Sequence, residues 1–201
     1  EEDNIEKKTQ SLAIDFIKKN HNKYSEIIIF DFGYLLSDEK LIKAINLINK
    51  KKITINCQSN SFNFGYNKFN KIKKANILGM DESEFRLFVS DKSNDLGLLI
   101  KNNKKKFKNY NYVFITAGKY GCYTIKKGSK IYYSPTVFKE NIIDSTGAGD
   151  IFLSMAHVAL KKDNFDIKFS NLIAHIVAGM HSKTLSNRYK LDNNLIKFIT
   201  N

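Results

Sequence analysis

Short apolar runs alternate with segments of helical periodicity along most of this chain, and the alternation limits the folds open to it. Four runs have the length and composition of buried strands: Glu26–Phe30, Lys52–Asn56, Asn76–Leu78 and Tyr112–Ala117. Apolar residues between the first two runs recur at the spacing of one helix face: Leu41, Ile42, Ile45 and Ile48. Strands that alternate with helices form a mainly parallel sheet with helices on both faces. The sequence therefore predicts an α/β fold, built as one domain over residues 1–201.

The second half of the chain departs from this alternation. The runs CYTIKK and KIYYS are separated by Gly128-Ser129, which predicts a β-hairpin. After residue 150 only helical periodicity remains. It forms three apolar stripes: Phe152, Met155, Ala156, Ala159 and Leu160; then Leu172, Ile176 and Gly179; then Leu191, Leu195, Phe198 and Ile199. We therefore expect the chain to end in helices.

The formal net charge of +13 raises the question of nucleic-acid binding, because basic surfaces bind phosphates. The abundance of Lys, Asn, Ile, Tyr and Phe, with one Pro and no Trp, instead indicates an A/T-rich coding sequence, so we expect no specific nucleic-acid partner. No run approaches the roughly 20 apolar residues that span a bilayer, and no signal peptide is visible. We expect a cytoplasmic protein without a membrane partner, in which Cys57 and Cys122 stay reduced.

A glycine turn, IDSTGAGDIF, comes directly before the first of the C-terminal helical stripes. Gly147 and Gly149 let an anion approach main-chain N–H groups at the positive end of a helix. A carboxylate beside an anion site repels the anion, so Asp150 is better suited to accept a proton from an attacking hydroxyl. A purely structural interpretation stays open, in which Ser145 or Thr146 caps the helix and Asp150 favours its dipole.

The full string DSTGAGD resembles the signature of the PfkB, or ribokinase-like, carbohydrate kinases, D-T-x-G-A-G-D. The resemblance implies a three-layer α/β/α fold and transfer of the ATP γ-phosphoryl group to a sugar hydroxyl. It implies that Asp150 is the base, that the main chain of Gly147, Ala148 and Gly149 is the anion hole, and that Mg²⁺ accompanies ATP. No Walker-type G-x-x-x-x-G-K-[ST] is present in the sequence, which excludes a P-loop kinase.

A second motif, FITAGKYGCY, resembles the strand–turn–strand of the same family, T-x-G-x-x-G. The resemblance places Thr116, Gly118 and Gly121 at the nucleotide. An ordinary glycine-containing hairpin turn is the alternative.

A third motif, GMDESEFRL, stands where the family carries N-x-x-E, whose Glu organises magnesium around the phosphates. Glu84 matches this pattern, and Asp81 replaces the Asn. A D-x-x-E sequence at a helix start also forms a capping box, so a structural role and a metal-site role remain equally open.

Further segments resemble one branch of the family, in which a sugar-kinase domain is joined to a nucleotidyltransferase, as in bifunctional heptose-phosphate proteins. These segments are DFGYLL, NCQSNSFNFGYN and SNR. The resemblance makes Gln58 and Asn60 candidate substrate contacts, although an Asn-rich loop in an Asn-rich protein is the favoured explanation of these residues. It places His175 and Asn187 on the nucleotide side, where a partly buried helix histidine is the alternative.

Complete members of the family carry an N-terminal sugar-binding region and a β lid, and neither is visible in this sequence. The resemblance therefore implies the nucleotide-binding part of a kinase for a sugar or sugar phosphate, with the acceptor, a fused nucleotidyltransferase and pairing into a homodimer left open. The alternative is a non-catalytic nucleotide-binding or assembly domain derived from such a kinase.

Overall fold

A computed structural model describes residues 2–33, 39–59, 72, 75–138, 142–161 and 166–185 of the chain. Its centre is a six-stranded sheet in which the strands lie in the order of the sequence. The strands are β1 (Ile27–Asp31), β2 (Ile53–Cys57), β3 (Ile77–Asp81), β4 (Tyr112–Thr116), β5 (Cys122–Lys126) and β6 (Ile131–Ser134). The first four strands are parallel, whereas β5 and β6 are antiparallel to their neighbours, so the expected hairpin is present.

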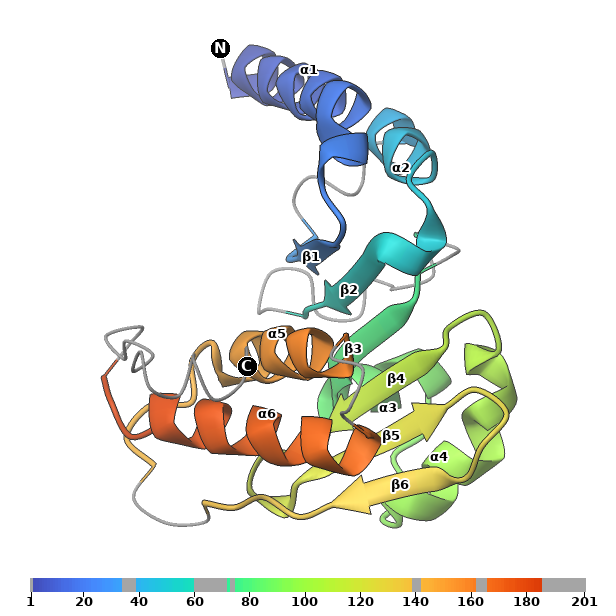
Figure 1. Cartoon of the computed structure of the whole chain (residues 1–201), viewed down its shortest axis with the longest axis vertical. Helices are drawn as coiled ribbons and strands as arrows, with labels where there is room; N and C mark the ends of the chain where they lie inside the picture. Colours follow the sequence, from blue (N-terminus) through green and yellow to red (C-terminus); the bar gives the residue numbers. More distant parts are fainter. Residues whose placement is uncertain are drawn as a thin grey trace.

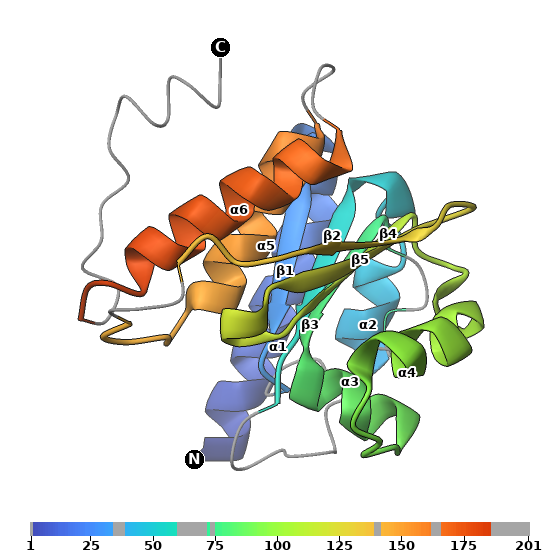
Figure 2. The ribbon, with the colours of Figure 1, turned by 90° about the horizontal axis from the view of Figure 1, so that it is seen from below.

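Helices cover the sheet on both faces (Figures 1 and 2). One face carries α1 (Glu2–Asn20), α2 (Glu39–Ile45), α3 (Glu82–Val89) and α4 (Leu96–Asn103), and the other carries α5 (Ala148–Leu160) and α6 (Ile167–His181). Because the parallel strands advance in one direction and their crossovers are right-handed, the connecting helices collect on one face. The chain covers the second face only after the hairpin. The predicted three-layer α/β/α architecture is confirmed.

The core forms two layers, one on each side of the sheet. The larger layer joins the sheet to the helices before β5, with Phe85, Ile100 and Ile115 fully buried. The other layer joins β3 and β4 to α5 and α6, where Phe114 packs edge-on against Phe152 with ring centroids 6.0 Å apart. Both layers rest on β2 and β3, whose apolar residues are buried on both faces of the sheet, as is typical of parallel strands with a neighbour on each side.

β1 departs from the sequence prediction. The run from Glu26 to Phe30 was expected to be buried, but Ile27 to Phe30 are only half-buried, whereas all five residues of β2 are buried. The reason is that β1 pairs with β2 alone within the described part of the chain, so it is an edge strand.

Some expectations lie outside the described residues, among them the helical stripe from Leu191 to Ile199. Within the described residues, no helix is long and apolar enough to cross a membrane. Cys57 and Cys122 are both buried, and neither forms a disulfide with a described residue.

Candidate functional site

The glycine turn lies at the carboxyl ends of the parallel strands, where open α/β sheets bind ligands. Gly147 has a φ of 77°, in the left-handed region that glycine adopts without strain, and α5 begins at the next residue. No side chain caps this helix, so neither Ser145 nor Thr146 has the capping role considered above. The main-chain N–H of Ala148 donates to the carbonyl of Ser145, 3.1 Å away. The remaining N–H groups of the first turn, those of Gly149 and Asp150, make no such bond within the described residues and are the orphan donors that an anion can occupy.

The carboxylate of Asp150 lies in a cavity of about 430 Å³ between this turn and the ends of β2 and β3. The side-chain amide of Asn56 donates to Asp150 Oδ1 over 2.8 Å, and the amide of Gln58 donates to the same oxygen. Burial raises the pKa of Asp150 above its usual range, while these two hydrogen bonds act in the opposite direction. Among the described residues, the side chains that hold this carboxylate in place are neutral amide donors.

Glu84 and Asp81 lie at the far wall of the same cavity, at the start of α3. They form the capping box: Asp81 Oδ1 accepts from the N–H of Glu84, and Glu84 Oε2 accepts from the N–H of Asp81, both over 2.8 Å. Glu84 Oε1 also accepts from the N–H of Ser59, 2.7 Å away, which ties α3 to the end of β2. Burial, followed by the charge of Asp81, raises the pKa of Glu84 to about 7.

A second cavity of about 360 Å³ lies on the other side of the turn, between the β4–β5 connection and α6. Its lining includes Thr116, Gly118, Gly121 and His175, so four of the residues assigned to the nucleotide by sequence lie around one space. Thr116, Gly149 and Phe152 line both cavities, which makes the turn the wall between them.

His175 lines this second cavity from α6, where its Nε2 lies 3.2 Å from the hydroxyl of Ser134. Its ring packs edge-on against Phe152 with a centroid distance of 4.9 Å. Burial lowers the pKa of His175 to about 4, so the imidazole is neutral at pH 7. The imidazole of His175 can form hydrogen bonds but carries no charge at pH 7, so it is better suited to contact a heterocycle than a phosphate.

Two of the residues predicted from sequence, Asn60 and Asn187, lie outside the described residues. The structure adds two that the sequence analysis did not select. Asn56 was missed because its partner Asp150 is 94 positions away and the chain is rich in Asn. His181, at the end of α6, is 1% exposed, and its Nε2 lies 2.8 Å from the carbonyl oxygen of Thr146. Since a carbonyl only accepts, Nε2 carries the proton and fixes the glycine turn to α6.

A family model and one known relative match almost the whole of this sequence. The family model of the pfkB family carbohydrate kinases matches residues 9–184. The bifunctional protein HldE of Aliarcobacter butzleri is 28% identical over 210 residues, which cover 99% of this chain and 42% of that protein.

Solved structures of kinases share the fold. Phosphofructokinase-2 from Escherichia coli, in complex with potassium, matches with a TM-score of 0.69 and 12% identity over 93% of this chain and 61% of its own. Ribokinase from Arabidopsis thaliana, complexed with ribose and ATP, matches with a TM-score of 0.65 and 13% identity over 92% and 58%. The chain thus spans less than two thirds of each relative, and at these identities the structures show a ribokinase-like fold alone. Because the family model covers most of the sequence, this chain belongs to the pfkB family of carbohydrate kinases.

Proposed function

We propose that this protein acts in the transfer of the ATP γ-phosphoryl group to a hydroxyl of a sugar or sugar phosphate. The observation that carries the proposal is the position of Asp150, whose half-buried carboxylate lines a cavity beside the unoccupied N–H groups at the start of α5. A base and an anion site have to be adjacent for a hydroxyl to attack a phosphoryl group. The pfkB kinases perform this class of reaction on small carbohydrates.

Asp150 is the base in this proposal. Its raised pKa makes it a stronger proton acceptor than an exposed Asp, while the amides of Asn56 and Gln58 keep one carboxylate oxygen oriented. The N–H groups of Gly149 and Asp150, which bond to no described acceptor, would face the transferred group and stabilise its charge, whereas the N–H of Ala148 already donates to the carbonyl of Ser145. In this proposal Gln58 orients Asp150 by donating a hydrogen bond to it. The assignment of Gln58 and Asn60 as substrate contacts remains a separate proposal.

ATP would bind with its base in the second cavity and its phosphates toward the glycine turn that separates the two cavities. Thr116, Gly118, Gly121 and the neutral His175 are the proposed nucleotide contacts, together with Asn187. A cavity with apolar walls and a few polar groups is typical of a site for an uncharged heterocycle.

Magnesium suits the acidic side of the first cavity only as a hydrated ion. Within the described part of the chain, no group of three or more His, Cys, Asp or Glu could hold a metal directly. Both oxygens of Glu84 already accept main-chain N–H groups, so Glu84 and Asp81 would hold the ion through its water ligands. When bound with ATP, Mg²⁺ would neutralise the charge of the phosphates.

A heptose phosphate is the acceptor that we propose to test first, and a fused nucleotidyltransferase is part of the same proposal. Its support is the similarity to a relative that is named as bifunctional, together with the segments noted in the sequence.

The experiment is a measurement of ADP release with a panel of sugars and sugar phosphates, for the wild type and for Asp150→Asn. The variant should lose about 10²- to 10⁴-fold in turnover, the range for a positioned base, while its affinity for ATP changes little. Asp166→Asn is the matched control, because Asp166 caps α6 through an oxygen that Asn retains, far from the proposed chemistry. Equal ADP release by wild type and Asp150→Asn would contradict the base assignment.

A non-catalytic nucleotide-binding or assembly role is the second candidate. It is favoured by the share of the relatives that this chain spans, 58% to 61% of the solved kinases. This role predicts that the protein binds ATP but that no sugar or sugar phosphate of the panel stimulates ADP release. The same result is expected for a longer polypeptide that contains this chain.

A further inference from the structure

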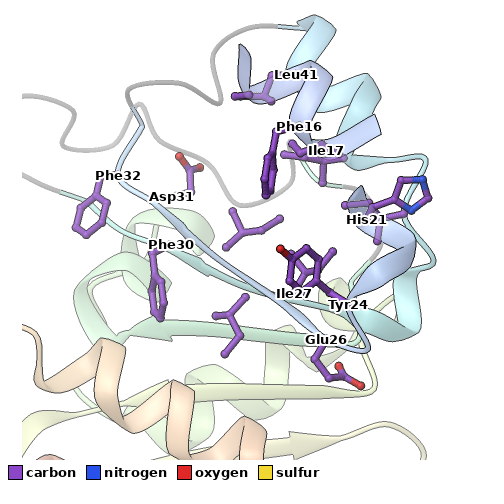
Figure 3. A pocket seen from close by; sticks show the side chains of 15 residues that line it. Phe16, Ile17, His21, Tyr24, Glu26, Ile27, Phe30, Asp31, Phe32 and Leu41 are labelled. Carbon is purple, nitrogen blue, oxygen red and sulfur yellow. The ribbon is translucent and has the colours of Figure 1, made fainter. Parts of the chain in front are cut away.

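His181, at the end of α6, differs from the other histidines of the chain in the group that it contacts. His157 and His175 are hydrogen-bonded to hydroxyl side chains. His21 lines an apolar groove of about 550 Å³ between α1, β1 and α2, away from the glycine turn (Figure 3). The Nε2 of His181 instead donates to a main-chain carbonyl inside that turn, the carbonyl of Thr146, over 2.8 Å.

The burial of His181 is difficult to explain by packing alone. The residue is 1% exposed, and its Nδ1 has no hydrogen-bond partner among the described residues. A buried acceptor without a partner destabilises a fold, whereas an apolar side chain of similar size would fill the same space without that cost. The contact that requires a histidine at this position is therefore the bond from Nε2 to Thr146.

The carbonyl of Thr146 belongs to the central peptide of a β-turn. The N–H of Ala148 donates to the carbonyl of Ser145 over 3.1 Å, which closes a turn over residues 145–148. Gly147 has a φ of 77° and a ψ of −2°, the values of the third residue of a type II turn. Thr146 is not among the described residues with a positive φ, which excludes the mirror-image type I′ turn.

A type II turn can change into a type I turn by rotation of this central peptide through about 180°. Because the peptide is trans, its carbonyl and its N–H point in opposite directions. The rotation therefore exchanges the sides on which the carbonyl of Thr146 and the N–H of Gly147 lie. Glycine adopts the negative φ of the type I form about as readily as the positive φ of the type II form. A contact from outside the turn can thus decide between the two forms.

The bond from His181 directs the carbonyl of Thr146 toward α6, so the N–H of Gly147 points away from α6. Gly147 lines the cavity that contains Asp150, and the described lining of the second cavity, beside α6, does not include it. Its N–H donates to no described acceptor, like the N–H groups of Gly149 and Asp150. In the type I form the carbonyl of Thr146 would take the place of this donor and repel an anion.

The chain before the turn is fixed to the same end of α6. The carbonyl of Ser182 accepts from the N–H of Ile143 over 2.8 Å and from the N–H of Asp144 over 3.1 Å. The N–H of Thr146 donates to Asp144 Oδ1 over 2.9 Å. These bonds hold the chain as far as the N–H of Thr146, and the bond from His181 is the described contact that orients the next peptide.

We propose that His181 is a positioning residue for the anion site, because its Nε2–H keeps the turn over residues 145–148 in the type II form. In this form the N–H groups of Gly147, Gly149 and Asp150 are presented together to the transferred phosphoryl group. This catalytic consequence rests on the proposed function, whereas the effect of His181 on the turn does not.

NMR spectroscopy of the 201-residue chain tests the effect on the turn. The Hα of the second turn residue lies close to the N–H of the third in a type II turn and far from it in a type I turn. We expect a strong NOE between the Hα of Thr146 and the N–H of Gly147, and a proton on Nε2 of His181 in a long-range ¹H–¹⁵N correlation. His181→Leu should weaken the NOE by at least about threefold, because the type I form becomes populated. His181→Gln keeps an N–H donor and should retain the NOE.

The kinetic test uses ADP release with the acceptor that the panel of sugars identifies. His181→Leu should lower kcat by about 10- to 100-fold, which is less than the loss of a complete oxyanion-hole donor, because the turn still samples the type II form. The KM for ATP should change by less than about threefold, since the cavity proposed for the base is not altered. His181→Gln should recover kcat to within about fivefold of the wild type.

His157→Leu is the matched control. It also removes a buried histidine and its hydrogen bond, to the side chain of Thr54 over 2.7 Å, but in the second half of α5. This variant should keep the NOE of the turn and the kcat of the wild type, whatever its effect on the unfolding midpoint.

The possible results distinguish the role of His181 from the proposed function. A strong NOE in His181→Leu overturns the proposal, and so does a wild-type proton on Nδ1 in place of Nε2, a measurement that requires no variant to fold. An equal fall in kcat for His181→Leu and His181→Gln, or for His157→Leu, overturns the positioning role. A weakened NOE in His181→Leu, with no acceptor-dependent ADP release by the wild type, supports the effect on the turn and contradicts the proposed function.

Discussion

Opposing influences act on the carboxylate of Asp150. Burial raises its pKa, and the amide donors of Asn56 and Gln58 lower it by stabilising the ionised form. Both amides come from the end of β2, so their position depends on the sheet and not on the glycine turn. A neutral donor pair orients a base without the large loss of basicity that a neighbouring Lys or Arg would cause.

Asn56→Leu is expected to shift the pH dependence of turnover. Loss of the donor raises the pKa of Asp150 further, and a base has to be deprotonated, so the acidic limb of the kcat profile should move to higher pH. Turnover should therefore fall more at pH 6 than at pH 8.

The matched control for this variant is Thr54→Val. Thr54 lies on the same strand and is bonded to His157 over 2.7 Å, so its loss removes a buried hydrogen bond away from Asp150. A uniform fall in kcat for Asn56→Leu, with no shift of the limb, would show that Asn56 serves the fold alone.

Glu84 should make the stability of the protein depend on pH. Its folded pKa of about 7 lies above the ordinary value of 4.5, so its contribution is fully present below pH 4.5 and is lost as the pH rises through 7. Glu84→Gln does not titrate. Between pH 4.5 and pH 8 the wild type should lose about 1 to 3 kcal/mol relative to this variant, measured by urea unfolding. A constant difference in the free energy of unfolding would contradict the raised pKa.

At the scale of elements, the turns that frame the site follow from backbone conformation. Gly147 starts α5 without a cap, and Gly121 has a φ of 102° where β5 begins. The glycine spacing allowed these turns to be predicted from sequence, because no other residue adopts such conformations readily. Whether they bind an anion could not be predicted from spacing, since a capped helix would carry the same glycines.

Gly121→Ala and Gly118→Ala should differ in their effect on stability. A Cβ at Gly121 would overlap the carbonyl oxygen of Ser134 and lie 2.9 Å from the Cα of Pro135, whereas a Cβ at Gly118 meets nothing within 4 Å. Both positions have a positive φ, so each variant should lose about 1 kcal/mol from backbone strain. Gly121→Ala should lose at least about 2 kcal/mol more, because main-chain atoms have to move. Equal unfolding midpoints for the two variants would contradict the tight packing of this turn.

At the scale of the whole molecule, periodicity was enough to predict the layers and the hairpin. Prediction was less complete where the partner of a residue is distant in sequence. Asn56 could not be selected, because its role depends on α5 folding back over β2. The apolar composition of β1 predicted burial, and this prediction was wrong for Ile27 to Phe30, because burial requires a neighbour on each side and the described residues supply only β2.

The order of the strands has a consequence for how the molecule is made. Each strand pairs with the strand before it in the sequence, so each step of sheet formation closes only the stretch of chain between two consecutive strands. During synthesis β1 leaves the ribosome first, and each later strand meets a neighbour that is already present. The six described strands can therefore be added to the sheet in one direction, from β1 to β6, as this part of the chain is translated.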